Sequence, residues 1–525
     1  MSSTTIGQVR IRTDTDDALA ARMRGEAALR ALDLEPPGMP ARTILCIRHL
    51  PDPLPGGLDL RSSHAPRATD WERAARNAIR DAFHRAVRAS DGPVPATADA
   101  VLFDDRAELL ACAARDLVRT NGGWWWRNVI RGGLAYVHVV REWLRAPEYV
   151  PAALEMLVAG GDAVAFVRML ETQQAVDLTA NVLRAHALEP LAAEIVRALA
   201  VAPATATPPR TPALPPTLQR LVPELVTSIA TAPVLAVEQR IFAAVALALR
   251  RAPAVVRGAA FVHEITAWIA PPEAAKPPVP QEEQPPVPRT PAPKATIPPG
   301  MNPMGPIGPI GPIGPISPMG PMGQMGPMGP MGQKQPTPPP PTAPSWELDL
   351  KPPHHEAGVQ TVPSPLLESG TVIDSGHAGI FFLLNVAIAL GLYDPYGRET
   401  PIDLDVWDFL ALTGRALVPE IIEDDVWPLL TALANRTEED DLPPLDEELL
   451  ARVRESLALV LAADSNAEDP AAFVIRRSAR ITLSPAHIDV TFCLAAHPIE
   501  IRVAGLDRDP GWIPAAGRHV DFHFD

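Results

Sequence analysis

The sequence predicts a mainly α-helical, multi-domain protein in which a disordered spacer rich in proline and glycine leads to a C-terminal α+β domain. With 525 residues, the chain has room for about three to four domains. Apolar residues recur at intervals of three and four through much of residues 16–269, as in amphipathic helices. Of the 525 residues, 63 are proline, which is more than twice the usual share of about 5 %. These prolines are concentrated between residues 271 and 353.

Residues 1–201 are expected to form a mainly helical domain with a small strand element. Either Asp104 or Asp105 is expected to cap a helix, because a carboxylate at that place accepts from backbone N–H groups of the first turn. The predicted elements are helices over 16–34, over 71–90, within 101–118 and, divided by Gly and Pro, over 124–200, with a strand over 42–50. A proline-rich linker, 202–216, then precedes a helical sub-domain, 217–270.

Residues 271–353 are predicted to be a spacer without a packed core, because proline fixes φ and lacks an N–H donor. Residues 305–334 repeat glycine at every third position, as GPI and GPM triplets, except at Ser317. A collagen triple helix needs glycine at every such position, so an extended spacer is favoured over a trimeric stalk. Thirty residues of polyproline II would reach roughly 90 Å. The spacer is therefore expected to separate two folded bodies.

Residues 354–525 are predicted to form an α+β domain. The apolar stretch 375–392 is interpreted as a buried core helix, since its uninterrupted part is shorter than the roughly 20 residues that span a bilayer. Alternation of apolar and polar residues near the C-terminus predicts strands. The predicted elements are helices over 404–415, 419–435 and 446–463 and strands over 487–494, 498–504 and 519–524.

The charge and cysteine content favour a cytoplasmic protein that does not bind nucleic acid. The 62 acidic and 46 basic side chains give a formal net charge of −16, which disfavours binding to a phosphate backbone. The three cysteines, Cys46, Cys112 and Cys493, show no paired spacing, as is usual in a reducing compartment. The first residues contain no apolar signal segment. No membrane span and no cofactor are predicted.

The best candidate metal ligands are His519, Asp521 and His523, because a strand places alternate residues on one face. The simpler interpretation is that these three polar side chains face water while Val520, Phe522 and Phe524 face a core. No phosphate-binding loop or nucleophile elbow occurs in the sequence. We therefore predict no enzyme, with a metal-dependent hydrolase as an alternative.

Two other features are candidates for contacts with a protein partner. Three consecutive indoles, Trp124, Trp125 and Trp126, cannot all face one core from a helix, so at least one is expected to be exposed, unless helices pack on both sides. Methionines at every third position would form an apolar ridge on a polyproline helix. They are Met319, Met322, Met325, Met328 and Met331.

The C-terminal region resembles a family of phage-tail-like contractile injection systems, usually called the tape measure protein family. The resemblance rests on residues 505–524, GLDRDPGWIPAAGRHVDFHF, and on Ala378-Gly379 followed by Leu390-Gly391-Leu392. The interval from Ala378-Gly379 to Leu390-Gly391-Leu392 is shorter than in the family, and within it Val386 stands where the family has proline. The resemblance covers about the last 150 residues and implies no catalytic residues.

What the resemblance implies is a structural or assembly role in a cytoplasmic particle, with contacts to tube, baseplate or cap proteins. Two bodies joined by an extended spacer suit a protein that bridges parts of a particle. The alternative from the residues alone is a scaffold or adaptor that displays its polyproline segment outside any injection machine.

Overall fold

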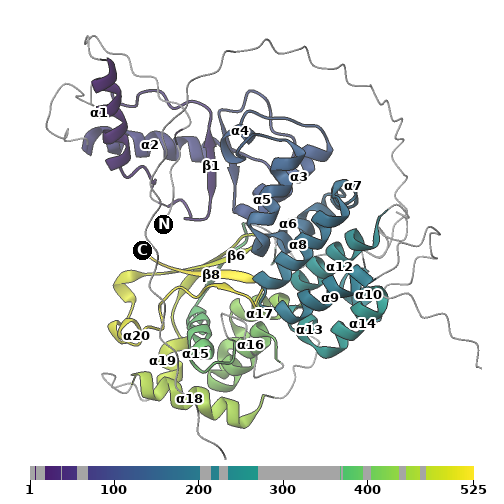
Figure 1. Ribbon diagram of the computed structural model, residues 1–525. Coiled ribbons are helices and arrows are strands. Elements are labelled where there is room, and N and C mark those ends of the chain that lie inside the picture. Colours follow the sequence, from purple (N-terminus) through teal and green to yellow (C-terminus); the bar gives the residue numbers. More distant parts are fainter. Residues whose placement is uncertain are drawn as a thin grey trace, which may run out of the picture. The chain divides into compact units, whose positions relative to one another are not determined.

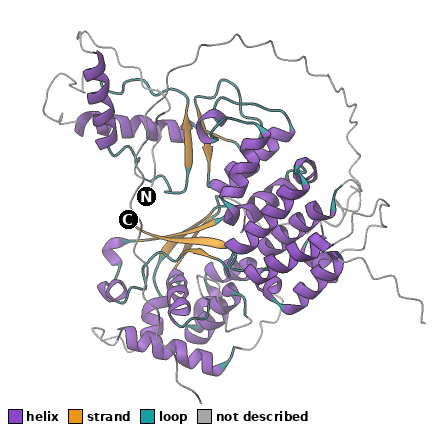
Figure 2. Ribbon diagram, viewed as in Figure 1, coloured by secondary structure: helices purple, strands orange, loops and turns teal. Residues whose placement is uncertain are grey.

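The fold is mainly helical, with a sheet region in its C-terminal part (Figures 1 and 2). The structure is a computed structural model that describes the residues in the following ranges: 18–36, 38–55, 69–201, 215–223, 235–269, 370–393, 404–436, 445–461 and 469–525, with the single residues 6 and 367. Most of the linker and the whole spacer 271–353 lie outside these ranges, and so do the candidate contact residues Met319, Met322, Met325, Met328 and Met331.

Residues 1–275, hereafter the N-terminal part, combine a small sheet with many helices. The strand order is β1-β3-β2, with β1 antiparallel and β2 parallel to β3. The strands are β1 (Ile44–Ile47), β2 (Val87–Arg88) and β3 (Ala100–Phe103). The helices are α1 (Ala18–Ala31), α2 (Thr69–Arg85), α3 (Arg106–Val118), α4 (Trp126–Val129), α5 (Tyr136–Arg145), η1 (Pro147–Tyr149), α6 (Val150–Ala159), α7 (Ala163–Met169), α8 (Thr172–Ala185), α9 (Glu189–Val201), α10 (Pro216–Leu221), α12 (Val237–Arg251), α13 (Pro253–Arg257) and α14 (Ala259–Ile269).

One hydrophobic core joins the small sheet and the helices on both sides of the linker. Helix α12 contributes an unbroken run of buried residues, 241–249, and packs against α6 and α8. Residues 217–270 therefore do not form a separate body, because they share this core with residues 46–195. The predicted sub-domain boundary is corrected accordingly.

Residues 362–525, hereafter the C-terminal part, contain a five-stranded sheet in the order β4-β5-β6-β8-β7. Only the β6–β8 pair is parallel. The strands are β4 (Val372–Ser375), β5 (Ala479–Leu483), β6 (His487–Phe492), β7 (Gly511–Ile513) and β8 (Arg518–Phe524). The helices are η3 (Ala378–Phe382), α15 (Leu383–Ala389), α16 (Val406–Leu417), η4 (Pro419–Glu423), α17 (Val426–Leu433), α18 (Glu447–Leu461), α19 (Pro470–Ile475), η5 (Leu494–Ala496) and α20 (Ile499–Val503).

The alternation of β6 and β8 places their apolar residues on one core. Ile488 and Val490 of β6 and Val520 and Phe522 of β8 are buried together with residues of α15 to α19. Figure 1 shows these helices on one side of the sheet. Because side chains alternate along a strand, the His and Asp residues of β6 and β8 lie on the opposite face. That face carries the candidate site.

Most predicted elements of the C-terminal part are confirmed, and several details differ. The predicted helix over 419–435 divides into η4 and α17, and α19 was not predicted. The segment 498–504 is the helix α20 and not a strand: Ile501 alone is buried, while Ile499 and Val503 are 65 % and 68 % exposed. The segment 375–392 is buried as expected, but it divides into η3 and α15. Strands β4, β5 and β7 were not predicted.

The N-terminal and C-terminal parts belong to one compact unit, while residues 276–361 form the other unit of the chain. The expectation of two bodies held apart by the spacer is therefore corrected. Each part has a hydrophobic core of its own, and Ala486 is the one residue of the C-terminal part, among those that the structure describes, that joins the N-terminal core. None of the helices in the described ranges has both the length and the apolar sequence that crossing a membrane requires.

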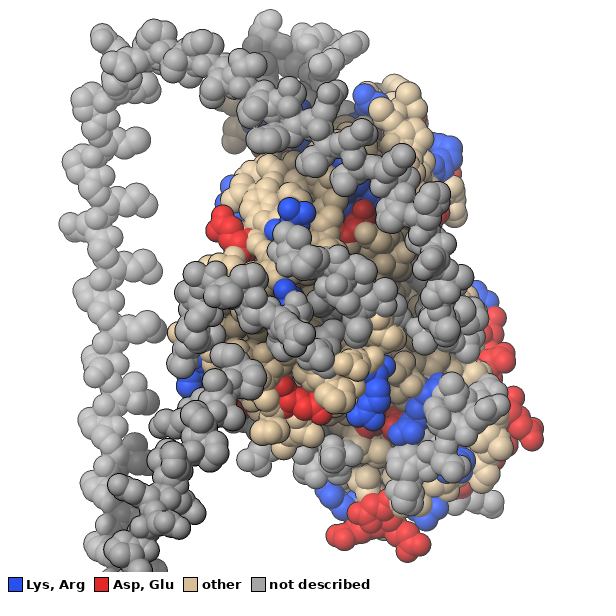
Figure 3. Space-filling model, turned by 90° about the vertical axis from the view of Figure 1, so that its right-hand side faces the viewer, with Lys and Arg blue, Asp and Glu red and all other residues tan. Residues whose placement is uncertain are grey.

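Charged side chains of both signs are interspersed on the face of the molecule shown in Figure 3. Blue and red residues alternate over short distances there, and neither colour forms a continuous patch among the described residues of that face. Where this face is formed by described residues, it shows no extended basic track of the kind that binds a phosphate backbone.

Candidate functional site

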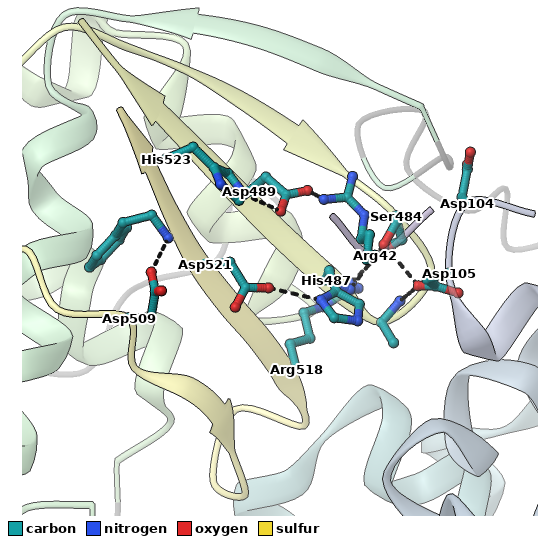
Figure 4. Close-up of polar contacts among 12 residues, drawn as sticks. Arg42, Asp104, Asp105, Ser484, His487, Asp489, Asp509, Arg518, Asp521 and His523 are labelled. Carbon is teal, nitrogen blue, oxygen red and sulfur yellow. Dashed lines mark hydrogen bonds and ion pairs between the residues drawn. The ribbon is translucent and has the colours of Figure 1, made fainter. Parts of the chain in front are cut away.

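The polar face of β6 and β8 is a ladder of histidine and aspartate that lies against the N-terminal part (Figure 4). The parallel register places His487 opposite His519 and Asp489 opposite Asp521. The hydrogen bonds run diagonally: His487 Nδ1 lies 3.0 Å from Asp521 Oδ2, and His523 Nε2 lies 2.9 Å from Asp489 Oδ1. Each pair thus ties the two neighbouring strands together through their side chains.

Asp105 is a fully buried carboxylate that holds the two parts together. Its Oδ1 accepts a 3.0 Å hydrogen bond from the backbone N–H of Glu108 and so caps helix α3. Its Oδ2 accepts two hydrogen bonds of 2.8 Å, from the hydroxyl of Ser484 and from the backbone N–H of Ala486, in the turn between β5 and β6. One side chain therefore satisfies donors of both parts.

Arg42 brings a second charged contact from the N-terminal part to the ladder. Its guanidinium pairs with Asp489, and both side chains are buried. Asp489 is thereby shared between Arg42 and His523. Burial lowers the pKa of Arg42, whereas the nearby charges of Asp105, Asp104 and Asp521 favour its charged form.

Aromatic rings fill the space between the two parts. The imidazoles of His487 and His519 stack with centroids 4.5 Å apart, and Tyr149 of η1 stacks on both, at 5.8 and 5.2 Å. Trp512 of β7 lies 5.1 Å from His519 and 5.1 Å from His186. Its indole N–H donates a 2.8 Å hydrogen bond to the carbonyl of Ala185, at the end of α8.

Arg518, at the start of β8, is buried in the same region. Its guanidinium donates long hydrogen bonds of 3.4 Å to the carbonyls of Ser484 and Pro485. Burial and the charge of Arg250 lower its pKa well below the usual value, while Glu155 opposes this shift. The carboxylate of Glu155 is itself paired with Arg250 at 2.7 Å. Burial of this arginine is a cost that the neighbouring carbonyls and carboxylate offset.

The structure places His519, Asp521 and His523 on one strand face, as their spacing predicts, but gives each a different partner. Asp521 bonds to His487, His523 bonds to Asp489, and His519 stacks between aromatic rings. Within the described part of the chain, no three His, Cys, Asp or Glu side chains are grouped so that they could hold a metal ion. The expectation that this face meets water is corrected, because it meets the N-terminal part.

The three tryptophans lie in the N-terminal core and its margin. Trp125 and Trp126 are 2 % and 1 % exposed, and Trp124 packs against the core while its indole N–H donates to the carbonyl of Ala98. The expectation of an exposed indole is therefore corrected. Trp124 and Trp125 precede α4, which begins at Trp126. The three side chains are therefore not spaced as on one helix, and all three can pack against the protein.

Several residues of this interface were not singled out from the sequence: Arg42, His487, Asp489, Tyr149, Ser484 and Trp512. One signal was present. His487-x-Asp489 and His519-x-Asp521 repeat the same spacing in two alternating segments, which is what two adjacent strands with a shared polar face would show. The other contacts join residues that are hundreds of positions apart, such as Trp512 and Ala185.

Comparisons with known proteins give no match for this chain: no family model, no curated protein and no solved structure is similar to it. Its function must therefore be argued from its own residues.

Acidification is expected to weaken the interface through His519. Burial and the neighbouring His487 lower the pKa of His519 to about 4. Between pH 6.5 and 4 the unfolded chain therefore takes up this proton first, so the free energy of unfolding falls with falling pH, by up to about 3 kcal/mol. A His519→Phe variant should keep the ring packing and lose this dependence, because Nε2 has no hydrogen-bond partner among the described residues. Urea titrations at several pH values measure the difference between variant and wild type.

Glu108→Gln provides a control of opposite sign. Burial raises the pKa of Glu108 to about 7, so wild type gains stability relative to this variant as the pH falls through the same range. For each variant, the quantity to compare is its free energy of unfolding minus that of wild type, followed as the pH falls. If this difference changed in the same direction for His519→Phe and Glu108→Gln, the assignment of the acid effect to His519 would be contradicted.

Proposed function

We propose that this chain is a non-enzymatic assembly protein of a phage-tail-like contractile injection system, which acts in the cytoplasm through contacts with tube, baseplate or cap proteins. The observation that supports it most is the use of the polar ladder. The histidines and aspartates that could have served a reaction are instead engaged in pairs and stacks between two parts of one chain. This use of the side chains supports a role in contact between parts of the chain.

The residues that carry the resemblance also have structural roles that a related fold would need. A Cβ at Gly379 would lie 2.0 Å from the carbonyl of Val474, so η3 approaches α19 closely only because residue 379 is glycine. Gly391 adopts a φ of +69° after α15, where Leu392 N–H donates to Ala387. Residues 505–524 form β7 and β8 and carry Trp512. These observations support the comparison at the level of the C-terminal part.

A second candidate function is a scaffold that displays its polyproline segment to other proteins. It is favoured by one observation: the segments before and after residues 276–361 in the sequence, 1–275 and 362–525, belong to one compact unit. A segment whose two neighbours in the sequence belong to one body cannot serve as a tether between two separate bodies. In either function, the spacer would contact other proteins and the folded part of the chain would carry the spacer.

Deletion of the gene, followed by electron microscopy of purified particles, tests the proposal. We expect contractile particles to be absent or incomplete without the protein, and restored by the full chain. A chain lacking residues 305–334 should fail to restore them if the repeats contact particle proteins. Normal particles in the deletion strain would exclude the assembly function, and binding of polyproline-recognising proteins alone would favour the scaffold.

A further inference from the structure

The interface between the N-terminal and C-terminal parts resembles an interface between two separate proteins, because the two parts share almost no hydrophobic core. The core of the N-terminal part draws on residues 46–269 and takes only Ala486 from the C-terminal part, while the other core lies wholly within residues 373–522. Among the described residues, the two cores are therefore almost entirely separate. An interface that does not share a core resembles those formed by proteins that also exist apart.

The contacts across this interface are specific and mostly polar. The turn between β5 and β6 reaches the buried carboxylate of Asp105 with two donors, and Asp489 meets Arg42. From the edge strand β7, Trp512 donates to the carbonyl of Ala185. These contacts define one orientation of the C-terminal part, and the same atoms would make the same contacts if the C-terminal part came from another molecule.

The connection between the parts is long, which makes such exchange possible. Residues 276–361 separate the two halves of the compact unit. For a connection of this many residues, the effective concentration of one part at the other is on the order of millimolar or below. In dilute solution the C-terminal part of the same molecule therefore occupies the surface, whereas in a crowded array a second copy can compete for it.

We propose that the surface of the N-terminal part formed by Arg42, Asp105, Tyr149 and Ala185 binds the C-terminal part of a second copy, so that copies of this chain link by exchanging their C-terminal parts. Exchange of an identical element is a low-cost route to association, because no new interface is needed. The proposal goes beyond the proposed function and does not depend on it, since it concerns contacts between copies only.

The test uses two preparations of the full chain, each with a specific protease site inserted within residues 276–361. One carries an N-terminal affinity tag and the other a C-terminal fluorophore. After equal amounts are mixed and cleaved, capture through the tag should retain the fluorophore, with about half of the tagged N-terminal parts holding a labelled partner at equilibrium. The uncleaved mixture should retain the fluorophore only near millimolar concentration.

Two results would overturn the proposal. In the first, the cleaved parts stay together but no labelled part ever reaches the tagged one, so the interface does not exchange. In the second, the parts separate on cleavage and do not bind again.

Variants show whether exchange uses this interface. Ser484→Ala removes a donor to the buried Asp105 and should weaken the association of the cleaved parts roughly ten-fold or more. Trp512→Phe keeps an aromatic ring and loses the hydrogen bond to Ala185, which gives a second variant if the first fails to fold. Asp374→Asn is the matched control, because this exposed carboxylate pairs with Arg480 within the C-terminal part. Equal association in all three variants would also overturn the proposal.

Discussion

Replacement of Asp105 by alanine is expected to destabilise the protein by about 4 kcal/mol. The change removes the N-cap of α3, which costs about 1 kcal/mol. It also leaves the hydroxyl of Ser484 and the backbone N–H of Ala486 without the carboxylate that accepts from them, and an unsatisfied buried donor costs about 1–3 kcal/mol. Urea unfolding followed by tryptophan fluorescence measures the loss.

Two variants separate the two roles of this side chain. In Asp105→Asn, the amide oxygen can still cap α3, while an amide NH₂ group replaces the oxygen that accepts from Ser484 and Ala486. The loss of unfolding free energy should therefore be smaller than in the alanine variant, but the interface should still be weakened. Asp469→Ala removes the N-cap of α19, where the carboxylate accepts only from the first turn of its own helix. We expect Asp469→Ala to lower the free energy of unfolding by about 1 kcal/mol. If Asp105→Ala cost no more than Asp469→Ala, the role of Asp105 between the parts would be contradicted.

The sequence predicted that either Asp104 or Asp105 caps this helix, and it could not predict the second role of Asp105. A cap is local: the carboxylate and the helix that it caps are adjacent, so the residue types alone indicate the contact. The partner Ser484 lies 379 positions away. A polar contact at that separation leaves no periodicity in either segment. Asp105 therefore looks like any helix-starting aspartate until the fold brings the turn 484–487 to it.

The alternating strands were predictable, and the meaning of their polar face was not. β6 and β8 each bury one side in a core, so their period of two is visible in the sequence. The opposite side is polar whether it meets water or another polar surface. Composition likewise located the spacer but did not indicate that the parts on either side of it pack together, because their interface consists of ion pairs, rings and single hydrogen bonds.

The short elements were missed or misassigned for a different reason. β7 has three residues, too few for a pattern, and is held by its pairing with β8. The helix α20 has five residues in which apolar and polar types alternate by chance, so a single turn of helix was read as a strand. Local pattern decides little at such lengths, and tertiary packing determines the conformation.

Gly379→Ala is expected to disrupt the C-terminal part, with a loss of about 3 kcal/mol or more. An added Cβ would lie 2.0 Å from the carbonyl oxygen of Val474 and 2.9 Å from that of Ile475. Both atoms belong to the backbone of α19, so no side chain can rotate to relieve the overlap, and η3 must move away from α19. Because all five residues of η3 are buried, this movement also opens the core.

Gly376→Ala is the matched control for this prediction. Three residues earlier in the chain, a Cβ would meet only the carboxylate oxygen of Asp424, at 3.4 Å, which is close to ordinary contact. We expect this variant to unfold at nearly the same urea concentration as wild type, while the Gly379→Ala protein unfolds at a much lower one or does not fold. Similar midpoints for Gly379→Ala and wild type would show that η3 and α19 do not lie in contact. The loss should also appear as weaker association of the cleaved parts, because strands β5 and β6 and the turn between them, which together contain Ser484 and Asp489, follow α19 in the chain.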